Sequence, residues 1–267
     1  MQRTLALGAG TALAGVGLIM TALVGTGQAS TSLRLASPFV LIPAQPDAFT
    51  GHNVTVRWAP CIVSSSGTQT HVIHYRVNPA GVPARAKLAQ QGIAKLEAAS
   101  GLTFKYDGET SYIPHNAVRN GQTVFQALDM ERRAHVPFVI AWAGQGSGRG
   151  DSNLLTSAEA GVGTVSWRSG STSQLRINDG AVVIRRNAGA ILAPGFQPNG
   201  SVGSLLLHEL GHAVGLEHSQ LGEIMYPIIG KGTPANYAAG DRRGLAHVGR
   251  AAGCMSTPRL PALNSFS

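Results

Sequence analysis

The sequence predicts an α+β fold: a twisted, mixed β-sheet of about five strands, one helix that carries the functional site, and two further helices. Three observations predict it. In the first half of the chain, segments rich in β-branched and aromatic residues flank a long helical pattern. Short apolar runs separated by glycine-rich stretches follow in the middle. Near the C-terminal end, a histidine-rich segment has the spacing of a further helix.

The N-terminal 29 residues predict an export signal. A single charged residue, Arg3, precedes an apolar run over 5–24, and small residues end the segment at Ala29, which is typical of a cleaved secretory signal. The run is also long enough for an uncleaved membrane anchor, which is the alternative. Residues 30–51 contain three prolines and predict an extended leader. Residues 52–267 are then expected to form one domain, because a chain of this length fits a single core.

The first predicted strand is the alternating segment 71–77, and the second is 102–106. Between them, 83–100 predicts a helix that starts at its own proline and stops at the glycine that follows it. A strand, a helix and a strand in this order predict a parallel pair joined by a right-handed crossover. Asp107 and Gly108 predict a turn after the second strand.

The middle of the chain predicts the rest of the sheet. Residues 109–136 show no clear apolar face and are interpreted as an insertion. The apolar run 137–142 predicts a buried central strand, and the glycine-rich stretch 143–163 predicts a long loop. Strands over 161–167 and 175–184 complete the sheet before the histidine-rich helix.

That helix contains a metal-binding pattern, H-E-x-x-H-x-x-G-x-x-H, formed by His208, Glu209, His212, Gly215 and His218. Helical residues four apart lie on one face with Cβ atoms roughly 6 Å apart, so His208 and His212 can share one ion. Gly215 can take the positive-φ conformation that ends a helix, which would bring His218 to the same ion and leave a fourth position open. Glu209 would lie beside the ion, where a general base belongs.

Two further features belong to the same helix. Ser201 and Asn199 are the candidates for its N-cap. Gly211 lies in mid-helix, where glycine costs about 1 kcal/mol relative to alanine, and such violations tend to mark functional sites.

A family resemblance rests on two stretches, HELGHAVGLEHS at 208–219 and EIMYP at 223–227. They resemble the zinc helix and Met-turn of the metzincin endopeptidases, and most closely the matrixins. The resemblance implies a zincin-like fold and a zinc endopeptidase with one catalytic zinc ion on His208, His212 and His218. It also implies peptide-bond hydrolysis by a zinc-activated water, with Glu209 as general base and Met225 as an apolar floor under the metal.

The resemblance implies a substrate cleft as well. Pro227, Ile228 and Ile229 occupy the place of the pocket wall for the residue after the scissile bond, and Ile229 stands where the family usually has tyrosine. The strand nearest the cleft would be an antiparallel edge along which substrate lies extended, and residues 162–165 are the predicted edge.

Other metal ligands are not expected. A second, histidine-ligated zinc is excluded because the glycine-rich loop has no histidine. Asp151 and Asp179 are candidate calcium ligands, but two isolated carboxylates are more often ordinary loop residues. The segment 241–249 resembles the C-terminal helix of the matrixins, and His247 is expected on its surface because the zinc ligand set is already complete.

The two cysteines, Cys61 and Cys254, lie near the two ends of the predicted domain. In an exported protein, the simpler interpretation is one disulfide. Closing so long a loop would stabilise the fold by up to about 5 kcal/mol in the chain-entropy model. A free thiol, or a Cys61 that blocks the zinc, is the alternative.

Charge and composition limit the partners. The formal net charge is +8, but the cations are scattered and lack interleaved aromatic residues, so nucleic-acid binding is not expected. We expect a secreted, extracellular monomer that acts on a protein or peptide substrate, with no stable membrane association unless the N-terminal segment is retained. The alternatives are a zinc hydrolase of a non-protein amide and a catalytically weak or inactive zinc-binding module.

Overall fold

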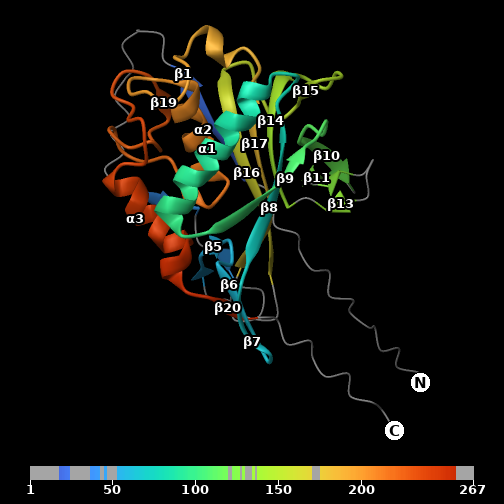
Figure 1. Cartoon of the computed structure of the whole chain (residues 1–267), viewed down its shortest axis with the longest axis vertical. Helices are drawn as coiled ribbons and strands as arrows, with labels where there is room; N and C mark the ends of the chain where they lie inside the picture. The colour runs from blue at the N-terminus through green and yellow to red at the C-terminus, as the bar shows by residue number, and fades with distance from the viewer. Residues whose placement is uncertain are drawn as a thin grey trace, which may run out of the picture.

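The computed structural model describes residues 18–24, 37–42, 45–46, 53–119, 122–126, 128–129, 134–135, 137–169 and 175–256. These residues form an α+β fold in which helices lie across one face of a twisted sheet (Figure 1). The predicted fold class is confirmed.

Five strands form the centre of the main sheet, in the order β16-β17-β14-β8-β9. All five match predicted strands: β8 (Val72–Asn78), β9 (Thr103–Glu109), β14 (Phe138–Gln145), β16 (Glu159–Ser169) and β17 (Leu175–Arg185). Strand β14 pairs in parallel with both β8 and β17, whereas β16 pairs antiparallel with β17. The sheet is therefore mixed, with a buried central strand.

Further strands extend this sheet. They are β1 (Leu18–Val24), β5 (Val56–Arg57), β15 (Asp151–Ser152) and β19 (Ile228–Ile229). Strand β1 pairs antiparallel with β16 and in parallel with β19. Strands β5 and β15 pair in parallel with β17 and β14, respectively.

The remaining strands form small separate sheets. These pair β2 (Val40–Leu41) with β18 (Leu216–Glu217), β3 (Gln45–Pro46) with β4 (Asn53–Val54), β10 (His115–Arg119) with β11 (Gln122–Gln126), and β12 (Leu128–Asp129) with β13 (Ala134–His135). A three-stranded sheet contains β6 (Cys61–Ser64), β7 (Gly67–Thr70) and β20 (Met255–Ser256).

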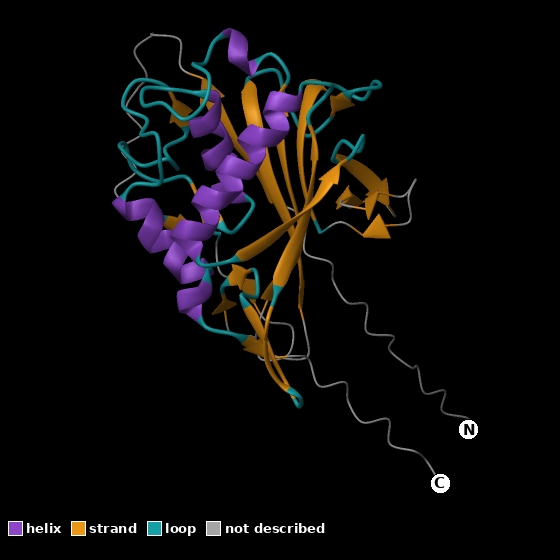
Figure 2. Cartoon of the chain, in the orientation of Figure 1, coloured by secondary structure: helices purple, strands orange, loops and turns teal. Residues whose placement is uncertain are grey.

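In the part of the chain that the structure describes, three α-helices cover the sheet: α1 (Pro83–Ser100), α2 (Val202–His212) and α3 (Ala239–Val248) (Figure 2). Two 3₁₀ turns accompany them, η1 (Ala188–Ala190) and η2 (Arg250–Ala252). Helix α1 begins at Pro83 and ends at Gly101, whose φ of 68° gives the left-handed cap that the sequence predicts. None of the helices in the described part of the chain has the length and apolar character needed to cross a bilayer.

The core forms because side chains alternate along the strands. On β14, Phe138, Ile140 and Trp142 belong to the large cluster that also contains the buried leucines of α2. On the other face, Val162 and Val183 pack with Leu154 and Leu155 of the loop before β16 in a second, smaller cluster. Both faces of the central sheet are thus covered.

Two local predictions are wrong. Asp107 and Gly108 do not end the second strand, since β9 continues to Glu109. The pairing of β8 with β9 shifts between Tyr75 and Val77, and Gly108 has a φ of 95°, so the dipeptide forms a bulge and not a turn. The predicted loop 143–163 is also shorter than expected, because β14 continues to Gln145 and β16 begins at Glu159.

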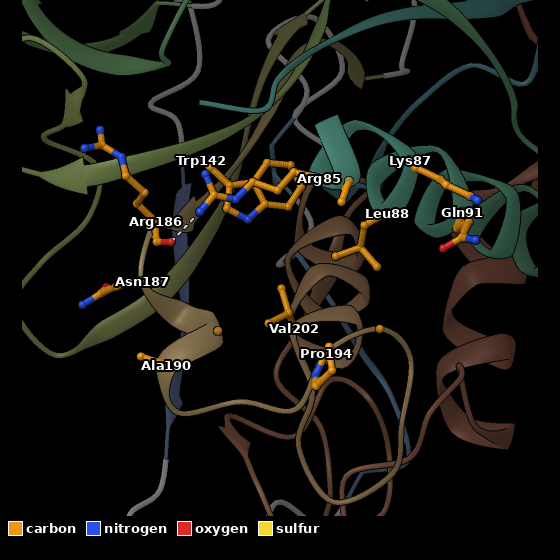
Figure 3. A pocket seen from close by; sticks show the side chains of 13 residues that line it. Arg85, Lys87, Leu88, Gln91, Trp142, Arg186, Asn187, Ala190, Pro194 and Val202 are labelled. Atoms are coloured by element: carbon orange, nitrogen blue, oxygen red, sulfur yellow. Dashed lines mark hydrogen bonds between the residues drawn. The ribbon is translucent and has the colours of Figure 1, made fainter. Parts of the chain in front are cut away.

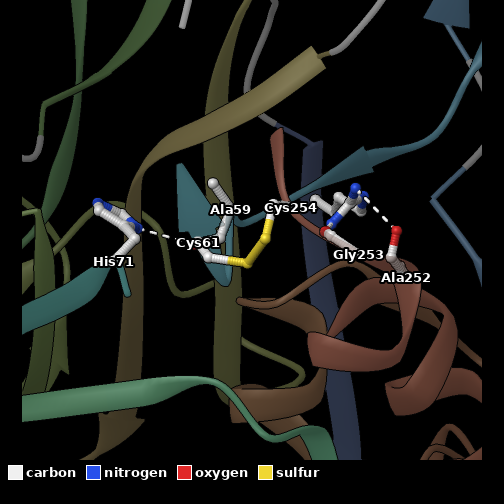
Figure 4. The surroundings of a disulfide bond; sticks show 7 residues. Ala59, Cys61, His71, Ala252, Gly253 and Cys254 are labelled. Carbon is white, nitrogen blue, oxygen red and sulfur yellow. Dashed lines mark hydrogen bonds between the residues drawn. A yellow bond between two sulfur atoms is a disulfide. The ribbon is translucent and has the colours of Figure 1, made fainter. Parts of the chain in front are cut away.

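The two cysteines are joined in the structure (Figure 4). Cys61 on β6 and Cys254 before β20 form a disulfide across 193 residues of sequence. Arg57 strengthens the same junction, because its guanidinium donates to the carbonyls of Ala252 at 3.2 Å and Gly253 at 2.9 Å. The first and last segments of the domain are therefore tied together.

Part of the predicted leader packs on the fold. The backbone N–H of Ile42 donates to the carbonyl of Gly215 at 2.9 Å, and β2 pairs with β18. Phe39 stacks on His247 with ring centroids 5.2 Å apart. Residues 37–42 therefore cover the point where α2 ends. Most of the predicted export signal, residues 1–17 and 25–29, lies outside the described residues.

Candidate metal centre

The helix that carries the histidines starts at a defined cap. The Oγ atom of Ser201 accepts from the backbone N–H of Ser204 at 3.0 Å, so Ser201, and not Asn199, is the N-cap. Every residue of α2 is buried. A helix buried on all sides is held rigidly, which fixes the positions of the side chains that it presents.

His208 and His212 face each other on this helix. The Nδ1 atom of His208 lies 2.7 Å from the carbonyl of Ile224, and that of His212 lies 2.8 Å from the carbonyl of Leu216. A carbonyl can only accept, so each Nδ1 carries the hydrogen and each Nε2 presents a lone pair. The two Nε2 atoms are 3.0 Å apart and, as two acceptors, cannot hydrogen-bond to each other. Such a pair fits a shared cation.

His218 completes the cluster from outside the helix. Gly215 has a φ of 116°, which turns the chain into β18 immediately before His218. The ring of His218 lies 5.2 Å from that of His208 and 4.9 Å from that of His212, centroid to centroid. One ligand atom from each of the three histidines lies within 4.8 Å of the others. Within the described residues, this is the one group of its kind.

Burial keeps the two helical imidazoles neutral. Loss of solvent, with a smaller contribution from the nearby His218, lowers the pKa of His208 to about 3. Burial also lowers the pKa of His212 well below its ordinary value, assisted by the charges of His208 and His218. Neutral imidazole is the form that binds a metal.

The donor set fits zinc. Two ligand nitrogens about 2.0 Å from a tetrahedral zinc would lie roughly 3.3 Å apart, close to the 3.0 Å between the Nε2 atoms of His208 and His212. Three histidines leave one coordination position for water or substrate. The carbonyls of Ile224 and Leu216, which accept from the two Nδ1 atoms, fix the orientation of the rings, as is usual for metal-binding histidines.

Glu209 lies against the neighbouring strand β16 and is fully buried. A Cβ at Gly161 would be 2.7 Å from its Oε1 atom. A Cβ at Gly163 would be 2.2 Å from the carbonyl oxygen of Glu209 and 2.7 Å from the Cβ of His212. The two glycines let the strand approach α2 closely enough to position the carboxylate.

The turn around Met225 packs against the helix that carries His208 and His212. A Cβ at Gly211 would lie 2.3 Å from the Sδ atom of Met225, which explains a glycine in mid-helix. Asp241 holds this turn: its Oδ2 accepts from the N–H of Ile224 at 2.7 Å and its Oδ1 from that of Met225 at 3.2 Å. The carbonyl of Ile224 in turn orients His208.

Comparison with known families decides the identity of this arrangement. The family model of the matrixins, a group of peptidases, matches residues 93–248, from the second half of α1 to the end of α3. The chain belongs to the matrixin family. Membership implies zinc and metallopeptidase activity in general, and the three histidines are close enough together to bind a metal. A search of the curated proteins returns no match.

Sequence reasoning missed three residues that shape this matrixin's site: Asp241, Gly161 and Gly163. Asp241 is the third residue of α3, where an acidic side chain often reaches back to the helix start, and its Oδ2 also accepts from the N–H of Ala238. The position of Asp241 near the start of a helix could therefore have predicted that its carboxylate accepts from backbone N–H groups. The two glycines alternate along a strand, a pattern that indicates close backbone approach but does not name the neighbour.

The predicted pocket wall and edge lie close to each other in this matrixin. Ile228 and Ile229 form β19, and Pro227 precedes it. Ile229 is fully buried, whereas Ile228 is partly exposed. The predicted edge, 162–165, belongs to β16, and β1 pairs with both β16 and β19. An extended backbone, that of β1, thus lies between the predicted edge on β16 and the predicted pocket wall at β19.

The other candidate ligands lie apart from the histidines. Asp151 lies beside Gly144, whereas Asp179 precedes Gly180, the partner of Phe138. The two residues therefore lie near opposite ends of β14, roughly 20 Å apart at 3.3 Å per residue, and cannot share one calcium ion. His247 is exposed on α3 and stacks on Phe39.

Proposed function

We propose that this matrixin is a secreted zinc endopeptidase in which Glu209 acts as general base. The observation that carries the proposal is the convergence of three histidines whose ligand atoms lie within 4.8 Å of one another, beside a buried carboxylate held against Gly161. When bound, zinc would supply Lewis-acid chemistry: it acidifies water and polarises the peptide carbonyl.

In this proposal, His208, His212 and His218 hold the metal and Glu209 moves the proton. Glu209 accepts a proton from water as the water oxygen attacks the carbonyl carbon. It then donates that proton to the amine nitrogen as the carbon–nitrogen bond breaks.

The edge of β16 that β1 separates from β19 is the proposed substrate site. The pairing of β1 with both strands supports this proposal, because residues 18–21 of the chain itself lie extended against 162–165 of β16. In the intact chain, residues 18–24 occupy that edge. Removal of residues 1–29 as an export signal would expose it to a substrate peptide, with Pro227, Ile228 and Ile229 as the pocket wall.

Secretion and the domain division form part of the same proposal. Residues 1–29 would be removed on export, 30–51 would remain as a leader, and 52–267 would form the catalytic domain. The Cys61–Cys254 disulfide supports an oxidising destination. N-terminal sequencing of protein recovered from the culture medium should begin at Ser30.

The decisive experiment compares wild type, Glu209→Gln and Glu109→Gln, each starting at Ser30, on a peptide pool derived from a proteome. Glu109 lies exposed at the end of β9 and serves as the carboxylate control. We expect one zinc per chain in all three and a fall in cleavage of at least about 100-fold in Glu209→Gln alone. Undiminished cleavage by Glu209→Gln would exclude the general-base role. Hydrolysis of small amides without peptide cleavage would exclude the peptidase assignment.

A further inference from the structure

A cavity of about 560 Å³ lies at the opposite end of α2 from the metal centre. The start of α1, the strand β14 and the segment around η1 surround it (Figure 3). Val202, the first residue of α2, lines the cavity. From Val202 the helix rises roughly 9 Å to His208 and roughly 15 Å to His212 at 1.5 Å per residue, and no histidine lines the cavity, so it is separate from the histidine cluster.

The walls of this cavity are mainly apolar. Trp142 forms one side, and Leu88, Pro194 and Val202 form the others (Figure 3). The volume falls within the range of about 300–1,000 Å³ that is usual for small-molecule sites. A flat or compact apolar body therefore fits the space.

Arg85 is the cation that faces these walls. Its guanidinium carbon lies 5.9 Å from the centroid of the Trp142 ring. It donates from Nη1 to the carbonyl of Pro79 at 3.1 Å and from Nη2 to that of Arg186 at 2.7 Å. A guanidinium has five N–H groups, so these two bonds fix the group in place and leave donors for a ligand.

Among the described residues, no carboxylate forms an ion pair with Arg85. The other charged residues that line the cavity, Lys87 and Arg186, are cations as well, and none of the lining residues is acidic. Burial, together with the charge of Arg186, lowers the pKa of the Arg85 guanidinium. In Figure 3 the side chain of Arg186 points away from Trp142 and Lys87 lies at the rim, so Arg85 is the principal anion-binding group.

We propose that this cavity binds a small organic acid, with its apolar body between Trp142, Leu88 and Val202 and its carboxylate on Arg85. Arginine binds carboxylates through paired hydrogen bonds, which are stronger than those between neutral groups. A basic ligand would be repelled by all three cations. An inorganic anion would leave the apolar walls uncovered and bind weakly. The proposal does not depend on peptidase activity.

The test uses three probes measured by isothermal titration calorimetry: 2-naphthoate, its neutral amide 2-naphthamide, and inorganic phosphate. We expect 2-naphthoate to bind at least about tenfold more tightly than either of the others, the effect of one charge-assisted contact. The measurement is made on zinc-loaded and on metal-free protein, because a carboxylate can also bind zinc. Equal affinity in both forms supports the cavity, whereas binding only to the zinc-loaded form overturns it.

A matched pair of variants locates the site without disturbing Arg85. Ala190 lines the cavity and is exposed. Ala190→Glu would supply the missing carboxylate and should weaken 2-naphthoate at least about tenfold, whereas Ala190→Gln, of the same size, should change affinity less than about threefold. Arg85→Gln should also abolish the preference for 2-naphthoate over its amide, and Lys95→Gln, on the same helix outside the cavity, should keep it. Equal binding by the Glu and Gln variants of Ala190 would overturn the proposal.

Discussion

A Cβ atom at Gly211 would lie 2.3 Å from the Sδ atom of Met225. The glycine that weakens the metal-site helix locally is therefore the residue that lets the sulfur pack beneath it. Gly211 and Met225 therefore act together. The loss of helix stability at the glycine is offset by the packing of Met225, which belongs to the turn that orients His208.

Gly211→Ala tests this relationship. Helix propensity alone would stabilise the variant by about 1 kcal/mol, but overpacking against Met225 costs about 1–3 kcal/mol, so we expect net destabilisation and weaker zinc retention. Urea unfolding and metal analysis measure the two effects. The double variant Gly211→Ala with Met225→Ala should be less destabilised than the sum of the single variants. Strict additivity would show that the two residues are not coupled.

The two glycines of β16 should give different defects. In Gly161→Ala the new methyl would meet the Oε1 atom of Glu209, a side-chain atom that can move, so we expect normal zinc content but at least about a tenfold loss in kcat. In Gly163→Ala the methyl would meet the backbone of Glu209, which cannot yield, so folding and zinc content should both fall. Metal analysis with steady-state kinetics separates the two outcomes, and identical behaviour of the two variants would contradict the assignment.

Asp241 should stabilise the turn around Met225. Its two carboxylate oxygens accept from the backbone N–H groups of Ile224, Met225 and Ala238. In asparagine one of the two oxygens is replaced by an amide nitrogen, which cannot accept, so at least one of these hydrogen bonds is lost. We expect Asp241→Asn to lower the free energy of unfolding by about 1–3 kcal/mol and to weaken zinc binding through His208. Chemical denaturation and competition with a zinc chelator measure this. Arg243→Gln, an exposed change on the same helix, should have neither effect.

Metal-free protein should lose stability in acid. In the fold, burial lowers the pKa of His208 to about 3, while in the unfolded chain a histidine takes up its proton near pH 6.5. Below about pH 6.5 the unfolded state therefore binds more protons than the folded state, so stability falls as the pH drops toward about 3, by up to about 1.4 kcal/mol per pH unit for one such group. Thermal unfolding between pH 7 and 4 after chelation checks the sign. His208→Gln should reduce the slope, and an unchanged slope would exclude this cause.

The sequence was sufficient for elements with local determinants. Helix α1 lies between its initial proline and the left-handed Gly101, and the strands β8, β14, β16 and β17 follow their apolar patterns. The spacing of His208 and His212 predicted that they would meet, because a helix fixes which residues share a face. The bulge at Gly108 was missed, since a glycine after an aspartate is equally compatible with a turn or with one extra residue in a strand.

The chain's own order of residues thus determined the fold class, the histidine pattern and the family to which the pattern belongs. Tertiary structure alone decided which backbone carbonyls orient the imidazoles and why Gly161, Gly163 and Gly211 lack side chains. It also decided that Arg85 lines an apolar cavity whose lining has no acidic residue. Spacing along one helix is a local property. Contacts between α2, β16 and the turn around Met225 join residues far apart in sequence, and only packing brings them within a few ångströms.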